Sequence, residues 1–184
     1  MGGDERVRLF CALQLPAETV ETIAAWQEEH LPGLRTVPPE NLHVTLVFIG
    51  ARPVADVAAI AAELRAAARA ARPASFRLRG YRETPRVGML VLEEAGMSPA
   101  AALVADLEHR LARLGLVAPP RRPWRPHITV TRFRERAGLA PPLPNICSIH
   151  VVRSALYRSS LGRGSAASSG ARYDALETAA LGGR

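Results

Sequence analysis

The stretch NLHVTLVFIG, residues 41–50, has the apolar character of a buried strand but is interrupted by two polar side chains, His43 and Thr45. Alternate residues of a strand face the same side. His43 and Thr45 therefore share one face of the predicted strand, and Val44 faces the other way. A single histidine in such a strand is usually structural, so this stretch alone does not predict a function.

The stretch RPHITVTRF, residues 125–133, repeats the interruption with His127 and Thr129. Each His-x-Thr pair follows a proline-rich connection, which is in turn preceded by a helical pattern. Two copies in matching contexts favour a common explanation over two unrelated core histidines. We therefore interpret the chain as two similar lobes that each contribute one His-x-Thr face.

The rest of the chain alternates between short strand patterns and helical patterns. Alternating or continuous apolar runs predict the strands, and apolar residues at helical spacing predict the helices. Pro16, and Ser98 with Pro99, are placed as helix starts, and Gly115 as a stop. Strands are predicted over 6–15, 41–50, 75–81, 86–94, 125–133, 147–157 and 171–180, and helices over 16–30, 53–71 and 98–115. The glycine- and serine-rich run 162–170 is predicted to be a mobile loop.

These elements predict an α+β fold with two pseudo-symmetric lobes of antiparallel sheet, helices outside and a central cleft. We expect residues 1–184 to form a single domain in which the two lobes interleave.

Composition narrows the function classes. The formal net charge is +7, and all 24 basic residues are arginine, which excludes chemistry that needs a lysine nucleophile or a P-loop lysine. The basic excess favours polyanionic partners. No apolar run reaches the ~20 residues of a membrane span, and no signal peptide is recognisable. We expect a cytoplasmic protein in which Cys11 and Cys147 are buried reduced thiols.

The paired motifs suit phosphodiester hydrolysis. If both polar faces line one cleft, two imidazoles flank a point, so that one can activate water while the other protonates a leaving oxygen. With ordinary pKa values near 6.5, one imidazole can be neutral and the other protonated near neutral pH. Threonine hydroxyls can donate to the non-bridging phosphate oxygens.

A zinc site is the main alternative use of two histidines, but it needs a third protein ligand. Neither motif strand supplies one, and the other candidates are poorly placed in the sequence: Glu40, Glu135 and Cys147. We therefore expect no metal and no other cofactor. The remaining histidines lack a threonine partner and are interpreted as structural or solvated: His30, His109 and His150.

The HVTL and HITV pair, together with RLFCALQLP, PPENLHVTLVFIG and LYRSSLGRGSAASSGARYDAL, resembles the two-histidine (2H) phosphoesterases. The resemblance is to the bacterial and archaeal branch called 2′-5′ RNA ligases, better described as RNA 2′,3′-cyclic phosphodiesterases, and it covers nearly the whole chain. One departure is Val130, where leucine is usual. The resemblance implies a metal-independent hydrolase that opens RNA 2′,3′-cyclic phosphate ends to 2′-phosphomonoesters, with weak ATP-independent 2′-5′ joining as the reverse reaction.

The resemblance also implies roles for individual residues. His43 would be the proton donor and His127 the proton acceptor, and three residues would hold the phosphate: Thr45, Thr129 and Arg132. The resemblance also places Phe48 near the substrate, with a position in the core as the alternative. Apart from the resemblance, the aromatic residues Tyr157 and Trp124 are candidate substrate contacts at the rim, again with core packing as the alternative. Arg132 and Phe48 each follow their motif histidine by five positions, which places them on the wrong face of a regular strand. A bulge or strong twist after each threonine would correct this.

RNA with 2′,3′-cyclic phosphate ends, including tRNA fragments or oligonucleotides, is the expected partner of a monomeric protein without membrane association. Two alternatives remain open at this point. One is a phosphoesterase that acts on small cyclic nucleotides, and the other is a non-catalytic module that grips RNA ends.

Overall fold

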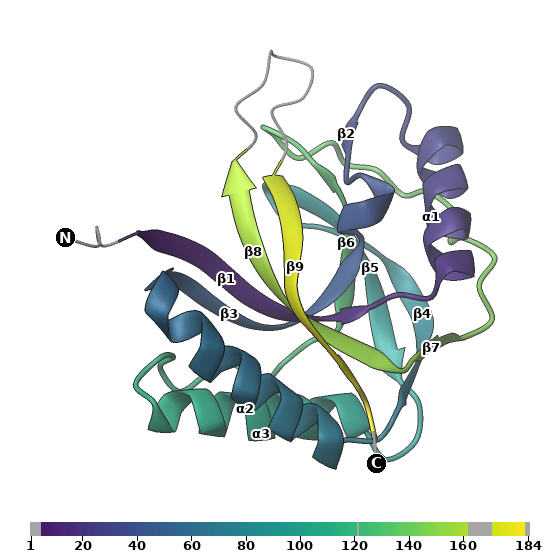
Figure 1. Ribbon diagram of the computed structural model, residues 1–184. Helices are drawn as coiled ribbons and strands as arrows, with labels where there is room; N and C mark the ends of the chain where they lie inside the picture. The colour runs from purple at the N-terminus through teal and green to yellow at the C-terminus, as the bar shows by residue number, and fades with distance from the viewer. Residues whose placement is uncertain (1–4, 121, 162–170, 183–184) are drawn as a thin grey trace.

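The computed structural model describes residues 5–120, 122–161 and 171–182 and contains three α-helices in those ranges (Figure 1). The helices are α1 (Ala17–His30), α2 (Val57–Ala70) and α3 (Pro99–Arg113). The strands are β1 (Arg6–Gln14), β2 (Arg35–Thr36), β3 (His43–Pro53), β4 (Ala74–Glu83), β5 (Val87–Glu94), β6 (His127–Arg132), β7 (Ile149–Val151), β8 (Arg153–Leu161) and β9 (Ala171–Ala180).

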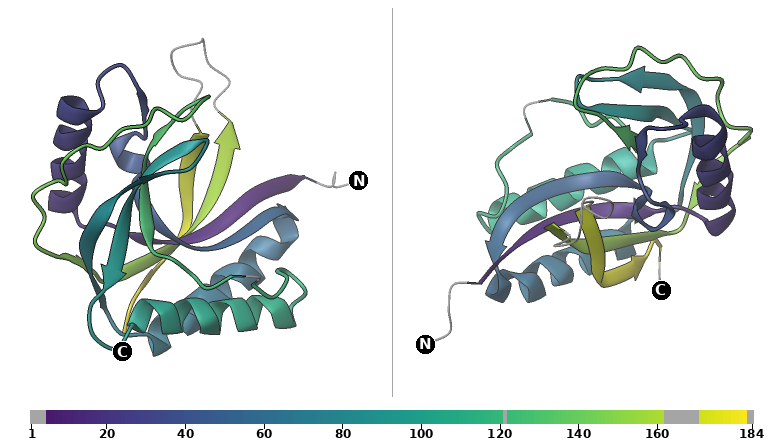
Figure 2. Two further views of the ribbon diagram at one scale, coloured as in Figure 1. Left: turned by 180° about the vertical axis from the view of Figure 1, so that it is seen from behind. Right: turned by 90° about the horizontal axis from the view of Figure 1, so that it is seen from above.

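All strand pairs in the described residues are antiparallel, and they form one sheet with the order β7-β4-β5-β6-β3-β1-β8-β9, while β2 pairs with β6. The two halves of this sheet meet where β3 pairs with β6, and their described register contains a single pair, Val44 with Ile128. The α+β class and the antiparallel sheet predicted from the sequence are confirmed. The sheet is strongly curled, so its two halves are inclined to one another (Figure 2).

The helices lie on the outer sides of the two halves (Figures 1 and 2). α2 and α3 lie against the half that contains β1, β3, β8 and β9, and an ion pair between Glu63 and Arg110 joins the two helices. α1 lies against the other half, where the ring of Trp26 is 6.3 Å from that of Tyr81 on β4. Burial of apolar helix faces such as Ile60 and Leu64 leaves the opposite side of the sheet for polar side chains.

The helix boundaries follow the predicted signals, with one difference in how a helix is capped. Ser98 is at the N-cap of α3 and Gly115 adopts a positive φ of 68° after its end, both at the predicted positions. The Ser98 side chain makes no capping bond, however. The Glu94 carboxylate accepts from the backbone N–H groups of Ala100 and Ala101 instead. A carboxylate from β5 therefore stabilises the positive end of the helix.

The cysteine prediction is half wrong. Cys11 is buried in β1, and burial raises the pKa of its thiol to about 12, whereas Cys147 is exposed. Cys147 lies in the irregular segment before β7, so its side chain does not reach the core.

The predicted strand over 147–157 is in fact two strands, β7 and β8. The run 162–170 lies outside the described residues. No helix in the described ranges is long and apolar enough to cross a membrane.

Candidate active site

The register between β3 and β6 places the four motif residues on one face of the sheet. Val44 is directly opposite Ile128, and both are fully buried on the core side. The residues that flank this pair therefore point to the other side: His43, Thr45, His127 and Thr129. We call this side of the sheet the site face. An antiparallel pair has a local twofold axis, so the two histidines occupy diagonal corners of the set, and the two threonines occupy the other corners.

Both imidazoles are fixed in the same tautomer. The Nδ1 of His43 is 2.7 Å from the carbonyl oxygen of Asn41, and the Nδ1 of His127 is 2.9 Å from that of Arg125. A carbonyl can only accept, so each Nδ1 carries the proton and each Nε2 presents its lone pair when the ring is neutral. The Nε2 of His43 lies 3.1 Å from the Thr45 hydroxyl oxygen. The second motif thus repeats the backbone contact of the first.

A bulge follows the threonine of each motif. In β3, Thr45 pairs with Ala12 and Val47 pairs with Cys11, so Leu46 is an extra residue. In β6, Thr129 pairs with Met89 and Thr131 pairs with Gly88, so Val130 is the extra residue.

Each bulge returns a later side chain to the site face, because an inserted residue reverses the alternation that follows it. Phe48 pairs with Phe10 and Arg132 pairs with Val87, two positions along from the partners of Thr45 and Thr129. Phe48 and Arg132 therefore both lie on the same side as the histidines, and in each half of the sheet a bulge places the side chain there.

Two side-chain donors hold the bulges. Gln27 of α1 is buried, and its side-chain amide donates to the carbonyl oxygens of Val130 at 2.6 Å and Val37 at 3.1 Å. In the other half, the Trp124 indole N–H donates to the carbonyl oxygen of Thr45 at 2.9 Å. Trp124 is therefore a link between the segment leading into the second motif and the strand of the first.

His43 lies among aromatic rings. The ring of Phe10 is 5.0 Å from the imidazole, that of Tyr173 is 5.5 Å away and that of Tyr157 is 6.3 Å away. The Gln14 side-chain amide donates to the Tyr157 hydroxyl at 3.1 Å. Phe48 is close to this group, with its ring 6.2 Å from Phe10, yet 73% of its surface is exposed. The predicted substrate contacts Phe48 and Tyr157 are therefore near the same histidine.

The pKa of His43 is lowered to about 4. Burial in this surrounding is the main cause, the hydrogen bond to the Asn41 carbonyl opposes the shift, and the nearby positive charges of His127 and Arg132 contribute to it. This result changes the expectation of two ordinary imidazoles, because the ligand-free protein keeps His43 neutral at pH 7. It also indicates that the charges of His127 and Arg132 act at His43.

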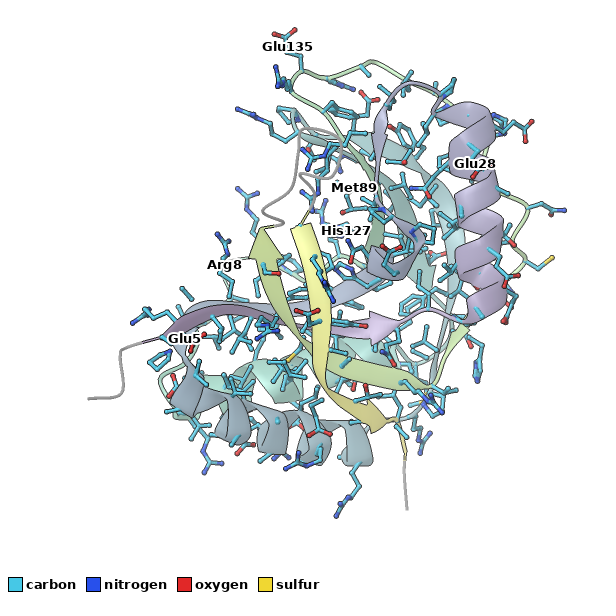
Figure 3. The ribbon with its side chains drawn as sticks, turned by 45° about the horizontal axis from the view of Figure 1, so that its top comes forward. Glu5, Arg8, Glu28, Met89, His127 and Glu135 are labelled. Carbon is cyan, nitrogen blue, oxygen red and sulfur yellow. The ribbon has the colours of Figure 1, made fainter. Side chains whose placement is uncertain are left out.

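Three residues beside His43 on the site face are not indicated by the sequence: Phe10, Gln14 and Tyr173. They lie on β1 and β9, whose register with β3 and β8 brings them beside His43. Alternation along β1 indicates only that Phe10 and Gln14 share a side of the strand, and nothing local in the sequence indicates that this side reaches the motif. Met89, labelled with His127 in Figure 3, likewise enters from β5 opposite Thr129.

Within the described ranges, no three His, Cys, Asp or Glu residues gather as a metal-binding group.

The family model of the 2′-5′ RNA ligase superfamily matches residues 15–156. Among curated proteins, the chain is 34% identical over 146 residues to an RNA 2′,3′-cyclic phosphodiesterase of Thermus thermophilus, covering 74% of each chain. It is 32% identical over 184 residues to the Escherichia coli protein of the same name, covering 87% of this chain and 91% of the relative.

Solved structures give the same result for the fold. The crystal structure of E. coli LigT complexed with 3′-AMP matches with a TM-score of 0.78 at 30% identity, covering 96% of this chain and 99% of LigT. A crystal structure of a Thermus thermophilus protein matches with a TM-score of 0.80 at 30% identity, covering 96% of this chain and 98% of that one. The similarity thus spans both halves of the sheet.

Proposed function

Because the chain belongs to the 2′-5′ RNA ligase superfamily and to its RNA 2′,3′-cyclic phosphodiesterases, we propose that it opens RNA 2′,3′-cyclic phosphate ends to 2′-phosphomonoesters without a metal ion. The observation that carries this proposal is the set of four motif residues on one face. Two imidazoles with oriented Nε2 atoms at diagonal corners, and two hydroxyls between them, suit a phosphate placed over the centre of the set.

The phosphate contacts follow from the same arrangement. The hydroxyls of Thr45 and Thr129 donate to non-bridging oxygens, where the negative charge of the pentacoordinate transition state develops. Arg132 approaches from beyond the second bulge, and its planar guanidinium suits two oxygens at once. Together these groups orient the phosphorus between the two histidines.

The proton transfers are assigned to opposite corners. The Nε2 of neutral His127 accepts a proton from water as the water oxygen forms its bond to phosphorus. The P–O3′ bond breaks on the opposite side, and the Nε2–H of protonated His43 gives its proton to O3′. The 2′-phosphate remains on the ribose. An RNA 5′-hydroxyl that takes the place of water in the same step would instead form a 2′-5′ linkage without ATP, and O3′ would again be the leaving group.

This assignment requires His43 to gain a proton when substrate binds, because its pKa is lowered in the ligand-free site. An anionic phosphate supplies the reason. It adds a negative charge beside the imidazole and offsets the positive charge of Arg132. The aromatic group around His43 then provides an apolar wall for the nucleoside, with Phe48 and Tyr157 as its contacts.

The first experiment is hydrolysis after treatment with EDTA. The protein should convert an oligonucleotide that ends in a 2′,3′-cyclic phosphate to the 2′-phosphate at a rate that added EDTA does not change. Alanine at His43 or His127 should reduce the rate by about 10²–10⁴. Tight binding of the same oligonucleotide without turnover would instead support a module that grips RNA ends.

The second experiment separates acid from base. A thiolate departs with little need for a proton, so replacing O3′ by sulfur should restore most activity to His43→Ala. The same substrate should leave His127→Ala slow, because water still lacks its base. Rescue of His127→Ala alone would reverse the two roles, and rescue of neither would mean that the histidines chiefly bind the phosphate.

A further inference from the structure

A pocket of about 440 Å³ lies along β3 beyond the point where β3 leaves β6. Its volume is within the range of about 300–1,000 Å³ that is typical of ligand sites. β3 remains paired with β1 on its other side, so its edge from Leu46 onward forms one wall of the pocket. The residues that give the pocket its chemistry are Phe48, Arg52, Glu108, Arg122 and Trp124.

The pocket adjoins the motif residues. Trp124 lines it and also donates its indole N–H to the carbonyl oxygen of Thr45, a residue of the site face. Phe48 lines it too, and the Phe48 ring is 6.2 Å from that of Phe10, which in turn is 5.0 Å from His43. One ligand chain can therefore contact the site face and continue into the pocket.

The pocket combines two cations, one carboxyl group and apolar surface. Arg52 is held against the wall, where its guanidinium donates to the carbonyl oxygen of Leu116. Arg122 is exposed and forms no ion pair with the described residues. Glu108 is half-buried, and burial raises the pKa of its carboxyl group. Cations suit a phosphate, and a carboxylate suits the N–H groups of a base.

We propose that this pocket binds the nucleotide immediately upstream of the cyclic phosphate, which makes RNA of two or more nucleotides the preferred substrate over a free cyclic mononucleotide. The inference rests on the proposed function, because departure of O3′ toward His43 places the ribose on the β3 side of the phosphorus. The 5′ side of that ribose continues the RNA chain, and the pocket is the cavity next to it on that side. Arg122 contacts the upstream phosphate, and Glu108 accepts from the upstream base.

Two substrates and two variants test the proposal. The substrates are uridine 2′,3′-cyclic phosphate and a guanosine-containing trinucleotide that ends in a 2′,3′-cyclic phosphate. Arg122→Ala and Glu108→Gln should each lower kcat/KM for the trinucleotide by about tenfold, equivalent to ~1.4 kcal/mol, and leave the mononucleotide unchanged. Arg113→Ala is the matched control, since Arg113 is an exposed arginine at the end of α3 that does not line the pocket.

Salt dependence separates a phosphate contact from a change of shape. Arg122→Ala should reduce the slope of log(kcat/KM) against log[salt] for the trinucleotide by about 0.7, the value for one single-strand phosphate contact. Arg113→Ala should keep the wild-type slope. The proposal would be overturned if Arg122→Ala and Glu108→Gln both turned over the trinucleotide at the wild-type rate and with the wild-type salt dependence.

A binding measurement keeps this proposal distinct from the catalytic one. Fluorescence anisotropy with a labelled trinucleotide that ends in a 2′-phosphate needs no turnover. Weaker binding by Arg122→Ala but not by Arg113→Ala supports the pocket even if no cyclic phosphate is hydrolysed, in which case the proposed function fails alone. Equal binding by wild type and both pocket variants would remove the pocket from the RNA path whether or not hydrolysis occurs.

Discussion

Gln27 allows the proposed role of the second bulge to be measured. Its side-chain amide donates to the carbonyl oxygens of Val130 and Val37 from inside the core, where 3% of its surface is exposed. Leucine has a similar size but cannot donate. Gln27→Leu therefore removes two buried hydrogen bonds, each with a net contribution of about 1 kcal/mol. The Val130 carbonyl still accepts from the backbone N–H of Val37, so the strand connection itself remains.

We expect Gln27→Leu to lower the free energy of unfolding by about 2 kcal/mol. For a domain of this size, that corresponds to a Tm lower by about 4–8 °C. The bulge at Val130 is what returns Arg132 to the site face, so its loosening should also lower kcat/KM for a cyclic-phosphate oligonucleotide by about tenfold at 25 °C, where the variant is still folded.

A double-mutant cycle with Arg132→Ala distinguishes positioning from general destabilisation. If Gln27 acts through Arg132, the further loss of kcat/KM on adding Gln27→Leu to Arg132→Ala should nearly vanish. Ser154→Ala is the matched control, because it removes a buried hydrogen bond to the Ala179 carbonyl far from the bulge. It should lower Tm and leave kcat/KM unchanged. Equal loss of kcat/KM from Gln27→Leu in both backgrounds would refute the reasoning.

Three further predictions concern charge and packing. The pKa of His43 is about 4 in the folded protein and 6.5 in the unfolded chain, so His43 lowers the free energy of unfolding as pH falls from 6.5 toward 4, by up to the order of 3 kcal/mol. In urea unfolding, the His43→Gln variant should therefore lose less stability than wild type over this pH range. Equal losses in the two proteins would contradict the shift. Arg132→Lys should lose well over twofold in kcat/KM, since an ammonium cannot replace a bidentate fork, and near wild-type turnover would remove Arg132 from the phosphate site. A Cβ on Gly88 would meet the Tyr81 hydroxyl oxygen at 2.1 Å and Thr131 Cγ2 at 2.7 Å. Gly88→Ala should therefore lower the stability of the folded protein by about 1–3 kcal/mol, measured by thermal unfolding. An unchanged Tm would show that both neighbours move aside at no cost.

The sequence predicts the helices and most strands because their signals are local. Apolar spacing marks the buried face of α2, and Ser98, Pro99 and Gly115 mark the ends of α3 at the observed positions. Period-two alternation also predicts that each histidine shares a face with its threonine. Alternation fails beyond the threonines, since a bulge is set by pairing with a neighbouring strand and has no reliable local sequence signal.

The environment of His43 depends on contacts that are distant in the chain, so sequence reasoning gave only part of it. Phe10 and Tyr173 come from strands near opposite ends of the chain, and both contact the imidazole through sheet register. The low pKa of His43 follows from the burial that these rings provide together with the charges on β6. Cys147 illustrates the converse, because an apolar neighbourhood in sequence does not ensure burial where the chain leaves the sheet.

The two motifs are equivalent in backbone but not in surroundings, and this difference is what can give them different roles. Each imidazole donates from Nδ1 to the carbonyl two residues earlier, and each threonine is followed by a bulge. His43, however, is enclosed by aromatic rings, whereas the contact that holds His127 is at the surface. An enclosed apolar wall suits a nucleoside and its departing O3′, and an open corner suits an incoming water. We infer that the aromatic residues of β1, β8 and β9, more than the motifs themselves, decide which histidine serves as the acid.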